Sequence, residues 1–533
     1  MLAVLFALDK ALALLRQVII ARQFGLSPEL DAFNAANNLP DLLFALISGG
    51  ALAVAFIPVL TSVLTDEGRK ASWLLFSRIA NLAFLVTAVF SLIFALLADQ
   101  LVGWEMGIAP GFNTEQQIVV IRLMRLNLFA TLIFSLSGLV MAGLQANQHF
   151  LLPALAPILY NTGQIFGALI LAPTKGYQIA GFQLPAAGQG VDGLVYGVIL
   201  GAALHLLIQI PGLLKFHFRW TPGLGLKDAA VQRVLSLLGP RVLTMLLIQL
   251  IFIVRDNLAS RLESGAVTAL AYGWMIQQVP ETLIGTAIGT AMLPTLAELV
   301  TRDKKEEFQN NIRNAVNVLI GLTVPVAFIF SVGLMPFFPT VFGFDDQGSQ
   351  LLMWVTRGYL LGLTGHCLLE VAARAFYAQQ NARIPLFAAV VNILLYISIG
   401  SLLFKPLGAP GISLTDAIAF TTQAVFLLFM LAWQIKPWFL KRLGNIFLNK
   451  DVLKTELSSA TGKFLFPVTL NAGNVLIRAL LAGIIGALLT YTSLQLFINL
   501  SLHPVIAATF SILIGGAVAL PFVFKEARTL LRL

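Results

Sequence analysis

Three basic residues lie within stretches of sequence that are otherwise apolar: Lys10, Arg16 and Arg255. A charged side chain inside a lipid-spanning helix costs about 2.5–3.5 kcal/mol on insertion scales, so such residues usually face a bundle interior or a water-filled cavity. Guanidinium and ammonium groups bind phosphate well where water is scarce. The pattern therefore predicts a cationic cavity, and its apolar flanks favour an amphiphile with a phosphate-bearing head.

The alternative for these cations is pairing with a nearby acid. Asp9 lies seven residues before Arg16, on nearly the same helix face, and Asp256 adjoins Arg255. Lys10 and Arg16 point about 120° apart on a helix, so they would flank a wide polar strip. Both readings, substrate cavity and internal ion pairing, are open at this point.

The composition indicates that these helices lie in a membrane. Of the 533 residues, 58% are hydrophobic and only 11% are charged, whereas soluble domains carry roughly 25% charged residues. The net charge is +9, but the lysines and arginines lie between apolar runs rather than in one patch. We therefore expect topological charge and no nucleic-acid partner.

Fourteen apolar segments are each long enough to cross a bilayer, which takes about 20 residues. They lie near 3–24, 36–64, 74–98, 118–144, 151–172, 193–214, 236–260, 267–299, 314–338, 350–377, 384–404, 410–435, 474–498 and 504–524. Basic residues concentrate in the loops after even-numbered segments, which places both termini in the cytoplasm. The stretch 441–473 reads as a cytoplasmic connector, either an amphipathic helix on anionic headgroups or a solvated linker.

Two stretches of the chain resemble each other, one beginning at Arg16 and one at Arg255. Each has a second arginine six residues later and then a proline followed by an acidic residue. The offset spans six segments, and an even number keeps the orientation, so a parallel repeat is predicted. The expected fold is an all-α polytopic membrane protein with two six-helix lobes, 1–220 and 221–440, and an extra helix pair at 474–533.

The sequence says less about what energy would drive movement of a ligand across the membrane. Asp256, Asn381 and Asn392 carry oxygens that could form a monovalent cation site, although ordinary polar contacts between helices are the favoured explanation for them. The chain lacks a GxxxxGK[ST] loop, which excludes ATP hydrolysis by that machinery. The five histidines are scattered without ligand spacing, so no metal and no other cofactor is expected. If the chain moves its ligand across the bilayer, membrane potential or a monovalent cation gradient would supply the energy.

The order and spacing of several motifs resemble the MurJ/MviN family of lipid II flippases, within the multidrug/oligosaccharidyl-lipid/polysaccharide exporter superfamily. The motifs include ARQFGLSPELDAF from residue 21, GLQANQHFLLPALAPILYN from 143, IGTAIGTAMLPTLAEL from 284 and RAFYAQQNARIP from 374. The similarity runs from the first segment to about residue 440, and the family also carries the extra helix pair. The resemblance implies that this pair walls a groove for a lipid tail.

The resemblance implies a transporter and not an enzyme. It would move a polyprenyl-diphosphate-linked peptidoglycan precursor, lipid II, to the outer leaflet of the bacterial cytoplasmic membrane by alternating access. Lys10 and Arg16 would contact the head group, joined by Arg255 from the charge argument. Asp31 would have a gating or structural role, to which we also assign Arg22 and Glu281. Other expected partners are anionic membrane lipids and cell-wall synthesis enzymes.

Two cavity cations that are usual in the family are missing here. Phe44 and Ala45 stand in the second segment, and Gly273 and Trp274 in the eighth, where charges would be expected. An exporter of another polyprenyl-linked glycan therefore stays an alternative, as does a drug or cation antiporter of the same superfamily. A polyprenyl-phosphate glycosyltransferase and a non-transporting scaffold are further alternatives, although the short outer loops disfavour the enzyme.

Overall fold

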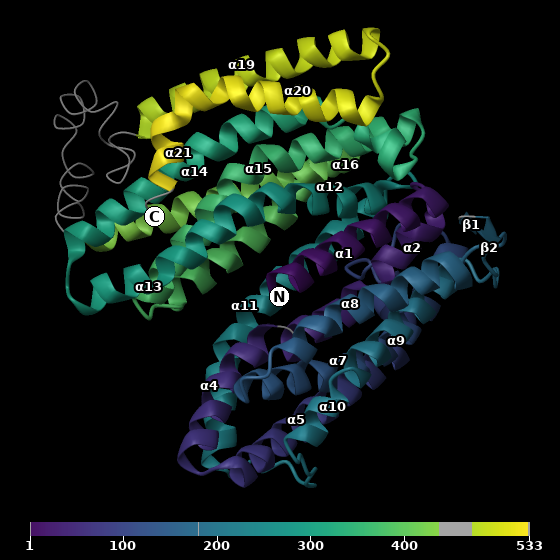
Figure 1. Ribbon diagram of the computed structural model, residues 1–533, viewed down its shortest axis with the longest axis vertical. Coiled ribbons are helices and arrows are strands. Elements are labelled where there is room, and N and C mark those ends of the chain that lie inside the picture. The colour runs from purple at the N-terminus through teal and green to yellow at the C-terminus, as the bar shows by residue number, and fades with distance from the viewer. Residues whose placement is uncertain (1, 49, 180, 436–471, 531–533) are drawn as a thin grey trace. The chain divides into compact units, whose positions relative to one another are not determined.

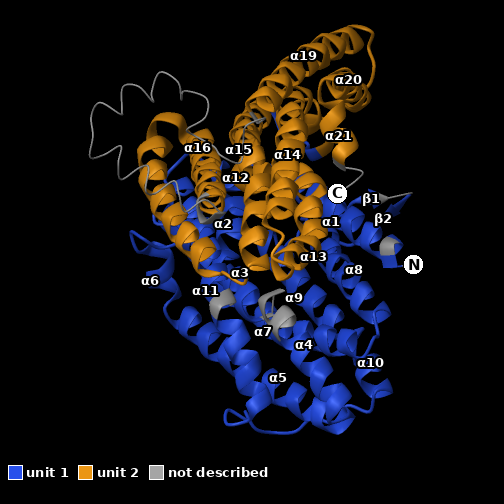
Figure 2. Cartoon of the chain, turned by 90° about the vertical axis from the view of Figure 1, so that its left-hand side faces the viewer, with its two compact units in different colours: residues 1–268, 342–345 blue, residues 269–341, 346–533 orange. Residues whose placement is uncertain are grey.

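A computed structural model describes residues 2–48, 50–179, 181–435 and 472–530 (Figure 1). The chain divides into two compact units (Figure 2). Unit 1 comprises residues 1–268 with 342–345, and unit 2 comprises residues 269–341 with 346–533. Nearly all described residues are helical, as predicted.

Unit 1 is a bundle of helices with one small hairpin. Its helices are α1 (Leu2–Phe24), α2 (Pro28–Ala36), α3 (Asn38–Leu43), α4 (Gly50–Asp66), α5 (Arg69–Leu96), α6 (Ala98–Gly103), α7 (Thr114–Ala146), α8 (Leu151–Phe166), α9 (Val191–Leu207), α10 (Ile210–Lys215) and α11 (Ala229–Ala259), with π-helical turns η1 (Phe44–Ser48) and η2 (Gly167–Leu171). Strands β1 (Gln178–Ile179) and β2 (Phe182–Gln183) pair antiparallel.

Helix starts in unit 1 follow the capping residues of the sequence. Ser27 accepts the backbone N–H of Leu30 at 3.2 Å, and Pro28 occupies the first position of α2. Asn113 caps α7 in the same way. These caps satisfy amide groups that a helix cannot pair internally.

A glycine seam joins α8 and η2 to α9. A Cβ atom on Gly163 would collide with the backbone of Gly201, and one on Gly167 with the backbone of Gly197. Only glycine allows two helices to approach this closely, as in the small-residue interfaces of membrane proteins. We define the glycine seam as these four residues. It fixes the spacing of two helices without using any side chain.

Unit 2 is also helical. Its elements are α13 (Ala287–Thr301), α14 (Lys305–Gly333), α15 (Asp346–Ala378), α16 (Arg383–Ile435), α19 (Ala472–Asn499), α20 (Pro504–Ala519) and α21 (Phe524–Leu530), with π-helical turns η3 (Glu281–Thr286) and η4 (Phe338–Phe342) and a 3₁₀ turn η5 (Leu520–Val523). Helix α12 (Ala266–Pro280) begins in unit 1 and continues in unit 2.

The extra helix pair, α19 and α20, packs against α14. A Cβ atom on Gly333 of α14 would collide with Ile512 of α20, and Gly483 of α19 lies against Phe328. Arg478 of α19 donates to Glu526 of α21 at 2.6 Å. The pair is thus an integral layer of unit 2.

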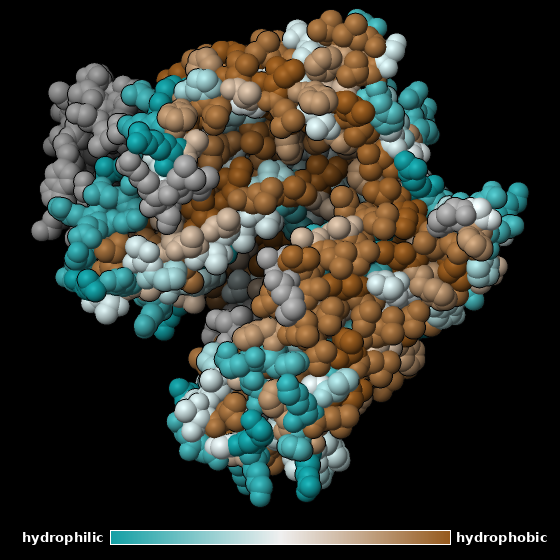
Figure 3. Space-filling view, viewed as in Figure 1, coloured by the Kyte–Doolittle hydropathy of each residue, from teal (hydrophilic) through white to brown (hydrophobic). Residues whose placement is uncertain are grey.

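Helices occupy most of each of the fourteen predicted spans, and short turns or bends interrupt several of them, as at Asn37, Leu97 and 334–336. Ten helical stretches in the described part of the chain are long and apolar enough to cross a membrane. Helix α16 kinks at Gly408, with φ at 62°, between Pro406 and Pro410, and therefore supplies two predicted spans. Hydrophobic side chains cover the flanks of the helices in each unit, and hydrophilic ones gather near their ends (Figure 3).

The compact units divide at residue 268, later than the lobe boundary expected at 220. The reason is that α11 packs against α3, α4 and α5 of unit 1. The boundary between the compact units does not show whether the two halves of the sequence are repeats, so the parallel repeat stays a prediction. Nearly all of the expected connector, 441–473, lies outside the described residues.

Candidate functional site

Arg16 of α1 is bonded to α8 through a neutral amide. Its Nη1 donates to Asn161 Oδ1 at 3.0 Å, and Nδ2 of the same Asn161 donates to Asp9 Oδ1 at 2.8 Å. Asn161 therefore bridges the acid and the base that the sequence places seven residues apart. We call Asp9, Arg16 and Asn161 the amide bridge.

Lys10 extends from the same region of α1. Its Nζ lies 3.5 Å from Asp9 Oδ2, and its side chain is 83% exposed while that of Asp9 is 13% exposed. Because the lysine is open to solvent, the pair contributes little to stability, and the ammonium can exchange Asp9 for a stronger anion. The structure thus brings the two predicted cations of α1 together around one carboxylate.

Arg255 of α11 has a different environment. It is 8% exposed, its Nε donates to Asp256 Oδ1 at 2.8 Å, and its guanidinium lies over the Phe252 ring, 5.1 Å from the centroid. Asn38 Nδ2 donates to the other oxygen of Asp256 at 2.8 Å. Arg255 is therefore a buried, acid-paired cation, as in the pairing alternative, and it belongs to unit 1 together with Lys10 and Arg16.

Asp31 binds the first turn of α12. It is 1% exposed and accepts the backbone N–H of Gly265 at 2.6 Å and both the N–H and the Oγ1 of Thr268 at 2.7 and 2.6 Å. A negative charge at a helix N-terminus is favourable. Burial raises the pKa of Asp31 to about 6, although the hydrogen bonds from Thr268 and Gly265 oppose this rise. These contacts are what a structural role for Asp31 would require. The choice between that role and gating stays a prediction.

The two other residues predicted to gate or support the structure lie in different units. Arg22 occupies the last turn of α1, where a cation complements the partial negative charge of the helix end. Glu281 begins η3 in unit 2, directly after Pro280. Its Oε1 lies 3.9 Å from Nδ1 of His366.

The three candidates for a cation site have separate partners. Asp256 of unit 1 is engaged by Arg255 and Asn38. In unit 2, Asn381 accepts the backbone N–H of Arg383 at 3.2 Å, and Asn392 donates to Gln423 at 2.6 Å. Asn392 lies roughly 13 Å along α16 from its start, so the structure does not bring the two asparagines together. Among the described residues, no group of three or more His, Cys, Asp or Glu side chains is arranged to hold a metal ion.

Aromatic packing fills the positions where further cations were expected. Phe44 meets the ring of Phe134 edge-on at 5.3 Å. Trp274 contacts the rings of Tyr359 and His366 at 5.7 and 5.3 Å. Phe44 is 38% exposed, whereas Trp274 packs against two rings, so an arginine in place of Trp274 would disrupt this packing.

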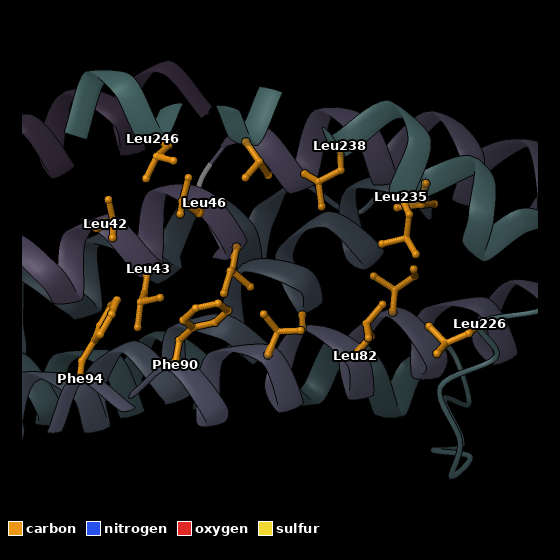
Figure 4. A pocket seen from close by; sticks show the side chains of 16 residues that line it. Leu42, Leu43, Leu46, Leu82, Phe90, Phe94, Leu226, Leu235, Leu238 and Leu246 are labelled. Atoms are coloured by element: carbon orange, nitrogen blue, oxygen red, sulfur yellow. The ribbon is translucent and has the colours of Figure 1, made fainter. Parts of the chain in front are cut away.

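Unit 1 also contains an apolar pocket of about 600 Å³ between α3, η1, α5 and α11 (Figure 4). Its 16 lining side chains are all hydrocarbon: Leu42, Leu43, Leu46, Ile47, Ile79, Leu82, Ala83, Val86, Phe90, Phe94, Leu226, Val234, Leu235, Leu238, Val242 and Leu246. A wall without hydrogen-bonding side chains suits a hydrocarbon chain.

Sequence reasoning missed the partners of the charged residues. Asn161 ends one of the motifs that carry the family resemblance, yet nothing in its spacing links it to Arg16, 145 residues away. Asn38 and His366 were likewise not assigned. A polar residue inside an apolar segment was the available signal, because such residues usually have a partner or a function.

Comparison with known proteins places these features in a family. The sequence model described as lipid II flippase MurJ matches residues 20–482. The lipid II flippase MurJ of Burkholderia cenocepacia is 29% identical over 431 residues, which cover 79% of this chain and 80% of that protein. The probable lipid II flippase MurJ of Treponema pallidum is 27% identical over 450 residues and covers 82% of each chain.

Solved structures agree on the fold. A lipid II flippase MurJ in an inward closed conformation superposes with a TM-score of 0.75 at 19% identity, over 99% of both chains. An inward-facing multidrug resistance MATE transporter of the MOP superfamily gives 0.65 at 14% identity, over 82% of this chain and 98% of that one. Since the family model covers most of the sequence, the chain belongs to the lipid II flippase MurJ family.

Proposed function

We propose that this protein flips lipid II from the cytoplasmic to the outer leaflet of the bacterial cytoplasmic membrane. It acts as a transporter and carries out no chemical conversion. Membership of the family supports the substrate. The amide bridge is the observation that carries the mechanism, because it holds an arginine at lipid depth with a neutral group as its direct partner.

The head group binds at Lys10 and Arg16 in this proposal. A guanidinium offers five N–H donors, and Asn161 accepts from one nitrogen, so donors are available for diphosphate oxygens. Arg255 adds to the electrostatic potential of the site but does not contact the head group, because it is already paired with Asp256. Transport follows alternating access, in which the head group crosses through the cationic cavity.

The polyprenyl tail stays in hydrocarbon throughout the cycle. The pocket of Figure 4 and the surface formed by α19 and α20 are both apolar enough to guide it. A chain that moved through water instead would lose about 0.8 kcal/mol for each exposed CH₂ group.

Both termini face the cytoplasm, as the distribution of basic loops predicts. The cycle draws on membrane potential or a monovalent cation gradient. Basic residues of the connector attract anionic lipids, and cell-wall synthesis enzymes would receive the flipped precursor.

Genetic replacement tests the proposal. The chain is expressed in a bacterium depleted of its own lipid II flippase, alongside Arg16→Ala and the control Arg302→Ala. Arg302 is an exposed residue paired with Glu298 at a helix end. Growth is expected with the parent and with the control but not with Arg16→Ala.

Failure of the well-expressed parent to restore growth would contradict lipid II as the substrate. The filled positions of Phe44 and Trp274 would then favour another polyprenyl-linked glycan. Growth with Arg16→Ala would contradict the proposed head-group site.

A further inference from the structure

Unit 2 encloses a histidine between two carboxylates from different helices. His366 lies on α15, Asp416 on α16 and Glu281 at the start of η3. Asp416 Oδ2 is 2.7 Å from His366 Nε2, and Glu281 Oε1 is 3.9 Å from His366 Nδ1. One carboxylate is therefore in tight hydrogen-bond contact, while the other stands beyond hydrogen-bond distance of the opposite ring nitrogen. We call these three residues the acid–histidine cluster.

The members differ in access to the outside. The side chains of His366 and Asp416 are 3% and 6% exposed, and that of Glu281 is 15% exposed. Glu281 is thus the least buried member of the cluster. Its loose contact and its greater exposure both mark it as the group that exchanges with surroundings.

Unsatisfied polar atoms surround this glutamate. In the described part of the chain, Glu281 Oε2 is buried without a hydrogen-bond partner, and so are both polar atoms of the Gln277 side chain. Gln277 is fully buried and lies one turn before Glu281, on the same helix face. A buried unpaired polar group costs about 1–3 kcal/mol. Unpaired atoms on Glu281 and Gln277 would be explained if a proton bound to Glu281 in part of the molecules and allowed further hydrogen bonds there.

The walls of the cluster favour a positive imidazole. Phe420 stacks on the His366 ring at 4.2 Å, and Trp274 meets it edge-on at 5.3 Å. Aromatic rings close to a cation stabilise it, and they exclude water. A strong field is therefore kept within the cluster.

Other charged or titratable groups nearby are few or already compensated. On α15, Glu370 follows His366 by one turn and is paired with Arg374, and the thiol of Cys367 is buried against Gly285. Thr323 of α14 and Thr364 of α15 are bonded to each other through their hydroxyl groups. Glu281 of η3 and Asp416 of α16 therefore dominate the charge around the imidazole.

We propose that the acid–histidine cluster is a proton-binding site, with Glu281 as the group that takes up and releases the proton. An imidazolium with two carboxylates carries a net charge of −1, and a proton on Glu281 brings the cluster to zero. A buried site strongly prefers the neutral state. Uptake forms one O–H bond on Glu281 at the expense of a hydronium ion, and release returns the proton to water.

The backbone at Glu281 suits a residue that moves. It is the first residue of a π-helical turn that separates α12 from α13, and Pro280 before it supplies no N–H. Such turns recur at functional sites in helices. A coupling of proton binding to the transport cycle would rest on the proposed function, whereas proton binding itself does not.

Infrared difference spectroscopy tests the site directly. The purified full-length protein in lipid nanodiscs, without lipid II, is titrated across neutral pH, and the carboxylic-acid C=O band is followed. A titrating band is expected in the parent and in Glu306→Gln, whose exposed glutamate lies in the first turn of α14. The part of this band that Glu281 contributes is expected to be lost in Glu281→Gln, whereas the part contributed by other carboxyl groups of raised pKa, such as Asp31, should remain.

A second variant keeps the test independent of that loss. In His366→Asn the positive neighbour is gone, so Glu281 should hold its proton to higher pH, with the midpoint raised by about 1–3 pH units. Thermal melting of each variant verifies that it is folded.

Absence of the band from the parent, or a band of undiminished amplitude in Glu281→Gln, would overturn the proposal. So would removal of the band by Na⁺ at constant pH, which would indicate a metal cation instead. Because lipid II is absent, the outcome is separate from that of the growth test.

Discussion

The amide bridge of unit 1 and the acid–histidine cluster of unit 2 are both polar groups in apolar helices, but they balance charge in opposite ways. In unit 1 the cation is held by the amide oxygen of Asn161, and the nearest acid is bonded to the other end of that amide. In unit 2 the imidazole is bonded directly to one acid and flanked by a second.

The difference teaches how a membrane protein can use buried charge for two purposes. A cation positioned by a neutral group keeps its field for an external anion such as a diphosphate. A cation enclosed by acids has its field compensated internally, so only a small ion such as a proton can change the balance. We propose that the first arrangement recognises a ligand and that the second takes up and releases a proton.

The largest expected effect is loss of transport in Arg16→Ala. A charge-assisted hydrogen bond contributes about 1.5–3 kcal/mol, which corresponds to a 10- to 100-fold slower rate of lipid II flipping in proteoliposomes. Arg302→Ala is expected to match the parent, and Arg16→Lys to fall between. An Arg16→Ala protein that flips at the parental rate would remove the amide bridge from the mechanism.

Among effects on stability instead of transport, the largest is expected in Asp416→Asn. Removal of one partner from a buried ion pair typically costs about 3–5 kcal/mol, so the melting temperature in detergent should fall by many degrees. Asp346→Asn, at the exposed start of α15, serves as control. Arg16→Ala should melt close to the parent, and equal melting of all three variants would erase the contrast between the two sites.

A smaller effect is expected when the bridge is given a charge. Asn161→Asp places a carboxylate directly against Arg16 and beside Asp9, so the guanidinium becomes compensated as in unit 2. We expect flipping to slow by about tenfold, equivalent to about 1.4 kcal/mol. Asn310→Asp, an exposed change on α14, controls for the added charge. An unchanged rate would show that compensation at Arg16 does not matter.

The smallest effect concerns Asp31, a buried carboxylate that receives N–H and hydroxyl groups. Its pKa is raised to about 6 from an ordinary value of 3.8. Between these values the folded state binds more protons than the unfolded state, so stability decreases as pH rises from about 4 to 6 and is level above. The melting temperature of the parent should show this slope, and Asp31→Asn should flatten it. A parallel pH profile in both proteins would contradict the assignment.

Hydrophobic runs and loop charges were sufficient to predict the helices. A segment such as 74–98 is long and apolar enough that only a membrane helix satisfies its backbone, and α5 occupies it. The kink at Gly408 was not predicted, but it lies between the predicted spans 384–404 and 410–435, where Pro406 and Pro410 interrupt a long apolar run. Motif order then indicated the family.

The partners of the charged residues could not be predicted in the same way. Periodicity assigns Arg16 to a helix face but does not say which distant residue meets it, and Asn161 is one of many polar residues in later segments. His366, Glu281 and Asp416 are likewise far apart in sequence, and they meet only because α15 packs against both η3 and α16. The neighbour of Arg255 was visible because it is adjacent in the chain.

The glycine seam affects how firmly Arg16, the arginine proposed to bind the head group, is held in place. Gly163 lies two residues beyond Asn161, so the amide stands on a stretch of α8 that touches its neighbour through bare main chain. A contact between main chains cannot be relieved by a change of side-chain rotamer. This part of α8 is therefore held rigidly, and the side-chain amide of Asn161 keeps one orientation. A single methyl group added at Gly163 would push α8 away from α9 and turn the amide of Asn161 away from Arg16.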